Sequence, residues 1–209
     1  MSNLAVVRIP KTGTVSLLTG MLPLMVSDQY PCVTNLHKTT DYFNRHPHDH
    51  DFITMVRDPL QQYISCYYFL KNRAHIAETG RHIHVDGRDG TLRTQRKAVE
   101  ASTSLEDYLS NTVVGDFAER YFGKVAPESF MFVGETNQME ASIAVLSKML
   151  NMPMQVHWEN RNPKRPTTLQ PYYVAPSVAA AFKARNASEY DLYERSVAHF
   201  NTLKATWLQ

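Results

Sequence analysis

The first residues of the chain most strongly constrain what it can fold into. Residues 4–8 form a short β-rich run, and a Pro-Lys-Thr-Gly turn follows at residues 10–13. This pattern predicts a strand, a tight loop and a helix through Met21, with Thr14 or Ser16 as its cap. Backbone N–H groups at such a helix start bind anions, and the hydroxyl groups and Lys11 add further donors. The sequence therefore predicts an oxyanion-binding loop, with an ordinary solvent-exposed turn as the alternative.

The order of residues in this loop differs from that of nucleotide triphosphatases. Their phosphate-binding loop places lysine directly after its last glycine and directly before the Ser or Thr that holds magnesium. Here Lys11 comes two residues before Gly13, the single glycine of the turn. The loop is therefore not expected to be a nucleotide triphosphatase motif.

Strand and helix patterns alternate along the rest of the chain. Strand patterns lie at residues 32–36, 52–56 and 130–133, and Pro59 suits the first turn of a helix. Further helices are expected at residues 105–111, 117–122, 139–150, 178–185 and 190–203. Residues 74–103 carry little periodicity and three glycines, which predicts a long surface excursion. The alternation is typical of a single α/β domain with a central parallel sheet flanked by helices, and 209 residues suit one such domain.

Composition excludes several classes of protein. The net charge is only +2, so a nucleic-acid role finds no support in the overall balance. Cys32 and Cys66 do not form a disulfide framework and are expected to be thiols in a reducing compartment. The apolar stretch 17–26 is interrupted by polar residues and falls short of the ~20 residues that a membrane span needs. With no leader recognised, the protein is expected to be soluble and cytoplasmic.

A second motif, Val56-Arg57-Asp58-Pro59, follows another predicted strand. Arg57 stands at the carboxyl end of that strand, where open α/β sheets place their ligands. Ser65 lies eight residues later, about two turns along the next helix. A guanidinium and a hydroxyl at this spacing can clamp a phosphate.

Together these residues resemble the sulfotransferases that use 3′-phosphoadenosine 5′-phosphosulfate (PAPS). In that family the loop after the first strand holds the 5′-phosphosulfate, and an Arg-Asp-Pro segment with a later serine holds the 3′-phosphate. The resemblance implies a P-loop-like sulfotransferase fold in which Lys11, Arg57 and Ser65 take these roles. The donor-binding residues that it implies are Arg8, Lys11, Thr12, Gly13, Thr14, Val15, Ser16, Arg57, Ser65, Lys164, Arg165 and Thr167.

The resemblance extends over most of the chain, with residues 74–128 fitting least well. Residues 130–135 and 139–150 look like a strand and helix of the family, and residues 160–168 resemble its late basic loop. The Tyr67-Tyr68-Phe69 run looks most like the heparan sulfate and uronyl 2-O-sulfotransferase branch. Within this run we expect Phe69 to be buried against the sheet and a tyrosine to face the cofactor or the glycan.

Sulfuryl transfer needs in-line geometry, stabilisation of the leaving oxygen and a base for the incoming hydroxyl. Lys11 is expected to stabilise the leaving phosphate, and His37 is the expected base. The resembling branch carries a His-x-His pair, of which this chain matches only His37, while Asn35 could orient the acceptor hydroxyl. An ordinary surface histidine is the alternative for His37. The histidines of residues 46–50 resemble a metal tract without a convincing partner set, so no metal is expected.

Charge is concentrated in residues 71–97. This segment holds seven basic and three acidic side chains, a net +4 in a chain of net +2. A basic patch beside the donor site would attract an acidic glycan, although a solvated loop is an equal alternative. Within the segment, Arg73, Arg81 and Arg88 are the expected acceptor contacts.

The sequence thus predicts transfer of a sulfuryl group from PAPS to a hydroxyl, with a neutral or acidic carbohydrate as the expected acceptor. The products would include 3′,5′-adenosine bisphosphate, with no metal required. Two alternatives stay open: a P-loop-type kinase or hydrolase, and a non-catalytic module with the donor-binding fold. The missing membrane anchor departs from the Golgi enzymes of the family and suggests a bacterial or viral protein, or a trimmed catalytic domain.

Overall fold

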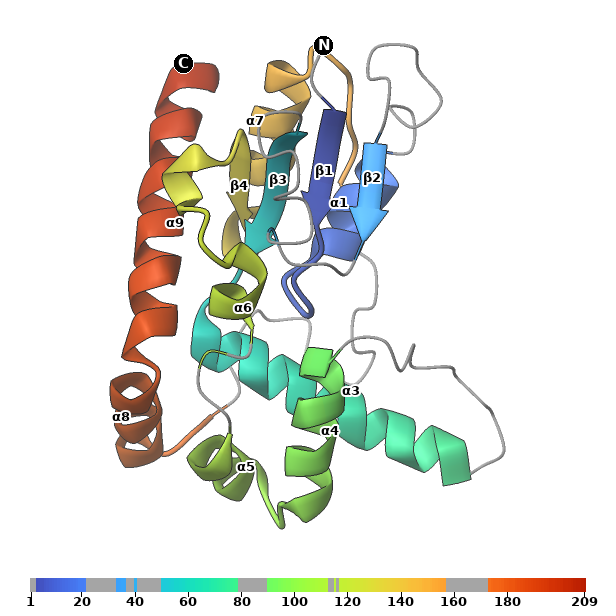
Figure 1. Cartoon of the computed structure of the whole chain (residues 1–209), viewed down its shortest axis with the longest axis vertical. Helices are drawn as coiled ribbons and strands as arrows, with labels where there is room; N and C mark the ends of the chain where they lie inside the picture. The colour runs from blue at the N-terminus through green and yellow to red at the C-terminus, as the bar shows by residue number, and fades with distance from the viewer. Residues whose placement is uncertain are drawn as a thin grey trace.

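The computed structural model describes residues 3–21, 33–36, 40, 50–78, 90–112, 115, 117–156 and 173–209. Within them, four strands form one sheet in the order β2-β1-β3-β4, and each neighbouring pair is parallel (Figure 1). The strands are β1 (Asn3–Val7), β2 (Val33–Leu36), β3 (His50–Val56) and β4 (Phe132–Glu135). The predicted strands are confirmed, with the last displaced by two residues.

The helices connect these strands and extend beyond their carboxyl ends. Figure 1 shows α3, α4, α5 and α8 on the side to which the strand arrows point. The helices are α1 (Thr14–Gly20), α3 (Pro59–Glu78), α4 (Gly90–Ala101), α5 (Leu105–Asn111), α6 (Ala118–Phe122), α7 (Met139–Met149), α8 (Pro176–Arg185) and α9 (Ala187–Trp207). Among the helices that the structure describes, none combines the length and apolar character needed to cross a bilayer.

The sheet is buried on both faces. Leu4 and Val6 of β1 enter one hydrophobic core, which α1 and α7 cover, whereas Ala5 and Val7 enter a second core covered by α3, α5 and α6. This division follows from the strand period of two, which sends successive side chains to opposite faces. Burial of both faces is typical of parallel sheets. The chain is therefore a mixed α/β protein, as predicted.

Helix α9 lies beside the edge strand β4 (Figure 1). Tyr190, near its start, packs in the core around α3, and Phe200, two to three turns later, packs in the core around α7. His199 Nε2 lies 3.0 Å from Phe130 O, just before the strand. A single helix thus joins the two cores along one edge of the sheet.

The expectation of a surface excursion over residues 74–103 is wrong for the described parts of that segment. Helix α3 continues to Glu78, and α4 covers Gly90–Ala101 and packs on α3 and α5. The buried side of α4 includes Gln95 and Val99. The Gln95 amide oxygen accepts a 2.6 Å hydrogen bond from Tyr108 Oη, which satisfies a polar group in the core.

Candidate functional site

The candidate site lies where the connections from two neighbouring strands diverge. The chain passes from β1 through α1 to β2, which lies on one side of β1 in the sheet. It passes from β3 through α3 towards β4, which lies on the opposite side, so the two connections run in opposite directions from the adjacent strands β1 and β3. The two helices also pack on opposite faces of the sheet. Open α/β sheets bind ligands outside the carboxyl ends of their strands at such a divergence. Residues 8–13 and Arg57 both follow strands that end at this position.

The turn after β1 has two residues in the left-handed region of backbone space. Lys11 has φ 66° and Gly13 has φ 79°. The Thr12 and Thr14 hydroxyls both donate to Ile9 O, at 2.9 Å and 3.3 Å, and so tie the turn to the end of the strand. Left-handed residues in a turn can bring successive backbone N–H groups to one concave surface, where they bind an anion.

Each of the three carbonyl groups of residues 10–12 accepts a hydrogen bond from a different part of the fold. Gln62 Nε2 of α3 donates to the first carbonyl oxygen at 2.7 Å. Arg57 Nη1, after β3, donates to the second at 3.4 Å, which is a long bond. Thr136 Oγ1, after β4, lies 2.6 Å from the third. The loop is therefore anchored to three elements through its carbonyl groups.

This anchoring determines where the N–H groups of the loop point. In a trans peptide the carbonyl group and the following N–H point in opposite directions. The described residues contain no cis peptide bond. The N–H groups of residues 11–13 therefore point away from Gln62, Arg57 and Thr136. An anion placed opposite any one of these anchoring donors would meet an N–H group rather than a carbonyl oxygen.

Positive charge accompanies these N–H groups. Arg8 and Lys11 come from the segment after β1 and Arg57 from the end of β3, and all three side chains are half-buried. The neighbouring carboxylate of Asp58 accepts the N–H of Gln61 at 2.9 Å, in the first turn of α3. Burial raises the pKa of the Asp58 carboxyl above its usual value, although this N–H and the charge of Arg57 oppose the rise.

One face of α3 lies against the loop. Gln62, Ser65 and Phe69 recur at helical spacing along it. The ammonium nitrogen of Lys11 lies 3.9 Å from the centroid of the Phe69 ring. Ser65 is half-buried on the same helix, and its role toward the donor stays a prediction.

The expected burial of Phe69 is found only in part, and the tyrosine expected to face the cofactor or the glycan stays a prediction. Phe69, predicted to be buried against the sheet, is only half-buried and lies beneath Lys11. Tyr67 is buried in the core, where its ring contacts Tyr108. Tyr68 is half-buried. The rotation of α3 about its axis thus presents the phenylalanine, rather than Tyr67, to the loop.

The capping prediction for α1 is also wrong. Gly13 is the N-cap residue, and no side chain caps the helix there, because the Thr14 hydroxyl is directed to the strand end. Ser16 is buried within α1, and Val15 is 38% exposed. The predicted donor-binding residues 12–16 therefore all lie in or next to the turn, but the hydroxyls of Thr12 and Thr14 hold the turn together.

A buried network beside the loop holds the end of β4. The Glu135 carboxylate, 6% exposed, accepts hydrogen bonds from Tyr193 Oη at 2.7 Å and from Gln138 Nε2 at 2.5 Å. Lys204 Nζ in turn donates to Gln138 Oε1 at 2.7 Å. Burial and the bond to Glu135 raise the pKa of the Tyr193 phenol. Both ends of this network are on α9, so that helix fixes the segment that carries Thr136.

Several predicted site residues lie outside the described part of the chain. These are His37, Arg81, Arg88, Lys164, Arg165 and Thr167. Asn35 is described through its backbone in β2, where it pairs with Val6, and Arg73 through its backbone in α3. The acceptor side of the predicted site thus remains a prediction.

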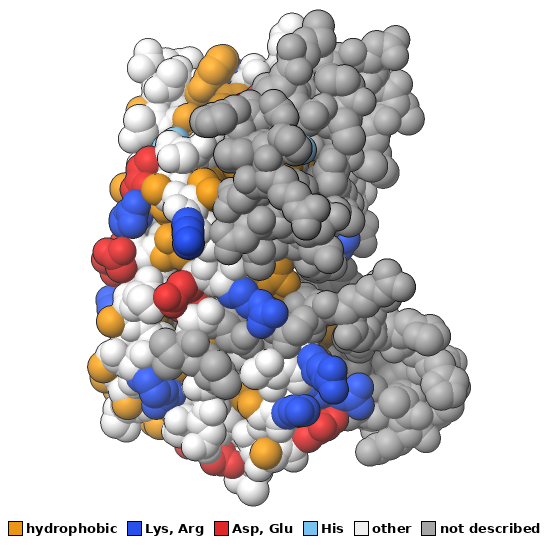
Figure 2. Space-filling model, viewed as in Figure 1, with side chains coloured by type: hydrophobic (Ala, Val, Ile, Leu, Met, Phe, Trp, Pro, Cys, Tyr) orange, Lys and Arg blue, Asp and Glu red, His pale blue; other side chains and the backbone are white. Residues whose placement is uncertain are grey.

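Part of the predicted basic segment is described. Figure 2 shows Lys and Arg side chains gathered over α4, and the exposed cations of that helix are Arg93, Arg96 and Lys97. Arg96 pairs with Glu100 at 2.8 Å on the exposed surface. Such a surface pair contributes little to stability. The three cations are exposed and are therefore accessible to solvent and to solutes.

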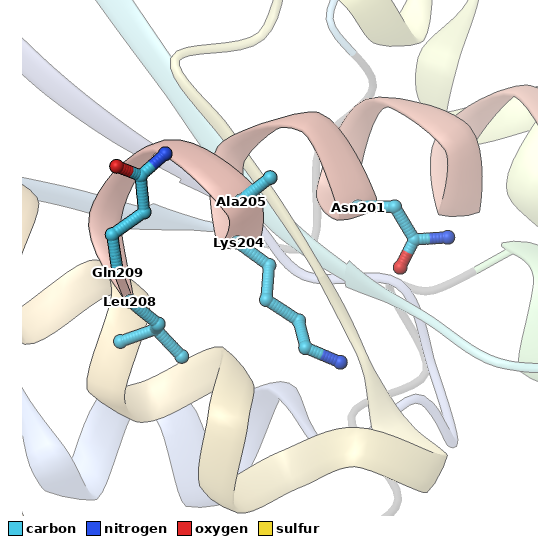
Figure 3. Close-up of a pocket in the computed structure, with 5 residues that line it drawn as sticks. All are labelled: Asn201, Lys204, Ala205, Leu208 and Gln209. Carbon is cyan, nitrogen blue, oxygen red and sulfur yellow. The ribbon is translucent and has the colours of Figure 1, made fainter.

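A hollow elsewhere on the surface is separate from the candidate site. It has a volume of about 450 Å³ and is lined by Asn201, Lys204, Ala205, Leu208 and Gln209 (Figure 3). This end of α9 lies beside the amino ends of the strands (Figure 1), whereas residues 10–13 follow a carboxyl end. None of residues 8–13, Arg57 and Ser65 lines the hollow, and Lys204 is the residue that it shares with the Glu135 network.

Sequence reasoning missed two residues that hold the loop, Gln62 and Thr136. Gln62 is a buried polar residue of α3, which is a signal for a specific partner. Thr136 lies three residues after the predicted strand 130–133 and directly after β4, at the edge where ligands bind. Both positions could have been suspected, but neither partner could have been named without the fold.

Comparisons with known proteins supply no relative from which a role could be transferred. No protein-family model, curated protein or solved structure matches the chain. The function is therefore inferred from the geometry of residues 8–13, Arg57 and the elements that hold them.

Proposed function

We propose that this chain transfers a sulfuryl group from PAPS to an acceptor hydroxyl, with a carbohydrate as the acceptor class. The supporting observation is the meeting of Lys11 and Arg57 where the β1 and β3 connections diverge, with the Arg57 guanidinium 3.4 Å from the Lys11 carbonyl. The N–H groups of residues 11–13 point away from their anchoring donors at the same position. Two cations and oriented N–H groups suit a ligand that carries several anionic groups.

The proposed mechanism is a direct in-line displacement. The acceptor oxygen attacks sulfur and forms a new S–O bond, while the bond between sulfur and the oxygen of the 5′-phosphate breaks. The acceptor proton passes to His37, and Lys11 offsets the charge that develops on the leaving phosphate. His37 directly follows Leu36 in the sequence, and Leu36 pairs with Val7 at the end of β1.

Within this proposal, Arg57 and Ser65 hold the 3′-phosphate of the donor. The long bond from Arg57 to the loop carbonyl is weak, so a phosphate can compete for the guanidinium with paired, charge-assisted hydrogen bonds. Lys164, Arg165 and Thr167 are proposed to complete the donor site. Arg73, Arg81 and Arg88 are proposed to contact the acceptor.

Binding of 3′,5′-adenosine bisphosphate tests the donor site. We expect this nucleotide to raise the Tm of the wild-type chain. It should bind at least tenfold more weakly to Arg57→Ala, because that substitution removes a charge-assisted contact. Arg120→Ala, an exposed arginine of α6, is the matched control and should bind like the wild type. Stabilisation by ATP with magnesium, without any effect of the bisphosphate, would contradict the proposal and favour a kinase or hydrolase.

Transfer of label from PAPS to a panel of glycans tests the reaction. We expect Lys11→Ala and His37→Ala to lose transfer, and wild-type rates in both variants would exclude the roles proposed for them. Tight binding of the bisphosphate without transfer to any acceptor would instead indicate a non-catalytic module.

A further inference from the structure

We propose that Phe69 is a positioning residue that holds the Lys11 ammonium group over its ring and thereby directs it toward the anion-binding side of the loop. This inference deepens the proposed function and rests on it. The ammonium nitrogen lies 3.9 Å from the ring centroid, well within the ~6 Å over which a cation is attracted by an aromatic face.

The placement of Phe69 on α3 explains why this contact is constrained. Phe69 lies seven residues after Gln62, about two helical turns, so the two side chains occupy the same face of α3. Gln62 holds the carbonyl of Pro10 at 2.7 Å, and Phe69 contacts the side chain of Lys11. One helix face thus fixes both the backbone of the loop and the position of its lysine.

The chemistry of an aromatic partner suits an anion site. Arg8 and Arg57 also stand at this edge of the sheet, and like charges would tend to drive the ammonium group away from them. The ring of Phe69 attracts the cation through its quadrupole and leaves the net charge of the site unchanged.

The backbone of Lys11 adds to this constraint. Its φ of 66° is uncommon for a residue with a side chain, and the carbonyls of its two neighbours, Pro10 and Thr12, are held by short hydrogen bonds. The direction in which the side chain leaves the loop is therefore set, and the ring receives it at that position. Loss of the ring would free the ammonium group without altering the loop backbone.

Acylation of Lys11 in the chain without nucleotide tests this inference. Brief exposure to acetic anhydride between pH 7 and pH 10, read by peptide mass spectrometry, reports the neutral fraction and the access of each lysine. Because the ring favours the charged ammonium, we expect Lys11 to react about two- to fivefold faster at a given pH in Phe69→Leu. Lys148, exposed on α7, is the internal reference.

Matched variants separate positioning from a structural effect. Phe69→Tyr keeps the aromatic face and should restore the wild-type profile, and Tyr68→Leu, the neighbouring half-buried aromatic, should leave it unchanged. Phe69→Met replaces Phe69→Leu if the latter unfolds. An unchanged Lys11 profile in a folded Phe69→Leu or Phe69→Met chain, or equal acceleration in Phe69→Tyr, would overturn the inference.

The same labelling separates this inference from the proposed function. The comparison among variants uses no nucleotide, so it succeeds or fails whatever the chain binds. Adding 3′,5′-adenosine bisphosphate should protect Lys11 of the wild type if the lysine faces the donor. If a saturating concentration of the bisphosphate left Lys11 and every other lysine of the chain unprotected, that result would count against the proposed donor site.

Discussion

The hydroxyl of Thr136 joins the end of β4 to the loop after β1 through the carbonyl of Thr12, at 2.6 Å. The same oxygen lies 2.8 Å from the carbonyl of Val56 at the end of β3. One side chain thus links three strand ends around the candidate site. A change at Thr136 should therefore affect the loop and the sheet together.

Thr136→Val keeps the shape of this side chain and removes its hydrogen bonds. We expect a loss of about 1–3 kcal/mol in the free energy of unfolding, because carbonyl groups are left without their donor. The affinity for 3′,5′-adenosine bisphosphate should fall as well, because the carbonyl of Thr12 loses its anchor. Urea denaturation and calorimetric titration measure the two effects. Thr202→Val, exposed on α9, is the control and should change stability by less than about 0.5 kcal/mol.

Gln62→Met should loosen the loop at Pro10, the first of the three anchored carbonyl groups. The buried amide donates to Pro10 O at 2.7 Å, so its replacement leaves that carbonyl unsatisfied and should cost about 1–2 kcal/mol of stability. Gln61→Met is a close control, because its side chain is half-buried on the same turn of α3. Equal effects of the two changes on denaturant unfolding would argue against a special role for Gln62.

Gly13→Ala should disrupt the turn itself. A Cβ atom at this position would lie 2.5 Å from Met139 Cε, and the φ of 79° is unfavourable for alanine. The backbone conformation alone should cost roughly 1–2 kcal/mol. We expect a lower Tm and weaker binding of adenosine bisphosphate. Ser110→Ala, exposed on α5 and away from the loop, should leave both nearly unchanged. A Gly13→Ala chain with wild-type Tm and affinity would show that the turn adapts.

Stability should depend on pH through Glu189. This fully buried carboxylate on α9 accepts the N–H groups of Phe117, Ala118 and Glu119 at 3.1–3.3 Å. Burial outweighs these bonds and raises the pKa of Glu189 to about 7 from 4.5. The folded chain then binds a proton more tightly than the unfolded chain, so the contribution is fully present below pH 4.5 and is lost as pH rises through about 7.

Denaturant unfolding between pH 4.5 and pH 8 measures this dependence. The slope from this group is at most about 1.4 kcal/mol per pH unit, and Glu189→Gln should remove it. Glu194→Gln, exposed on the same helix, should retain the wild-type slope. A slope of the same size in Glu189→Gln would assign the pH dependence to another group.

The strands and most helices could be predicted because their apolar residues recur at regular periods. Helix α4 was missed because the buried position Gln95 is polar, which hides the period formed by Leu92 and Val99. That glutamine accepts a hydrogen bond inside the core from Tyr108 of α5. A residue far along the chain thus supplies what the local pattern lacks.

The candidate loop could be located from its motif, but its supports could not. The positions of Gln62 and Thr136 around residues 10–12 depend on the sheet order, which no local pattern encodes. The contact of Phe69 with Lys11 has a similar cause. Helical spacing predicts which residues share a face, but the rotation of the helix is set by packing against α5 and the loop.

The position of α9 along β4 has a consequence for association between molecules. An uncovered edge strand offers its backbone groups to a strand of another chain, which is a common start of aggregation. Here α9 lies along that edge and is held there by the Phe130, Glu128 and Glu135 contacts. Strand addition at β4 would require the helix to leave both hydrophobic cores, so at this edge the sheet is protected from growth.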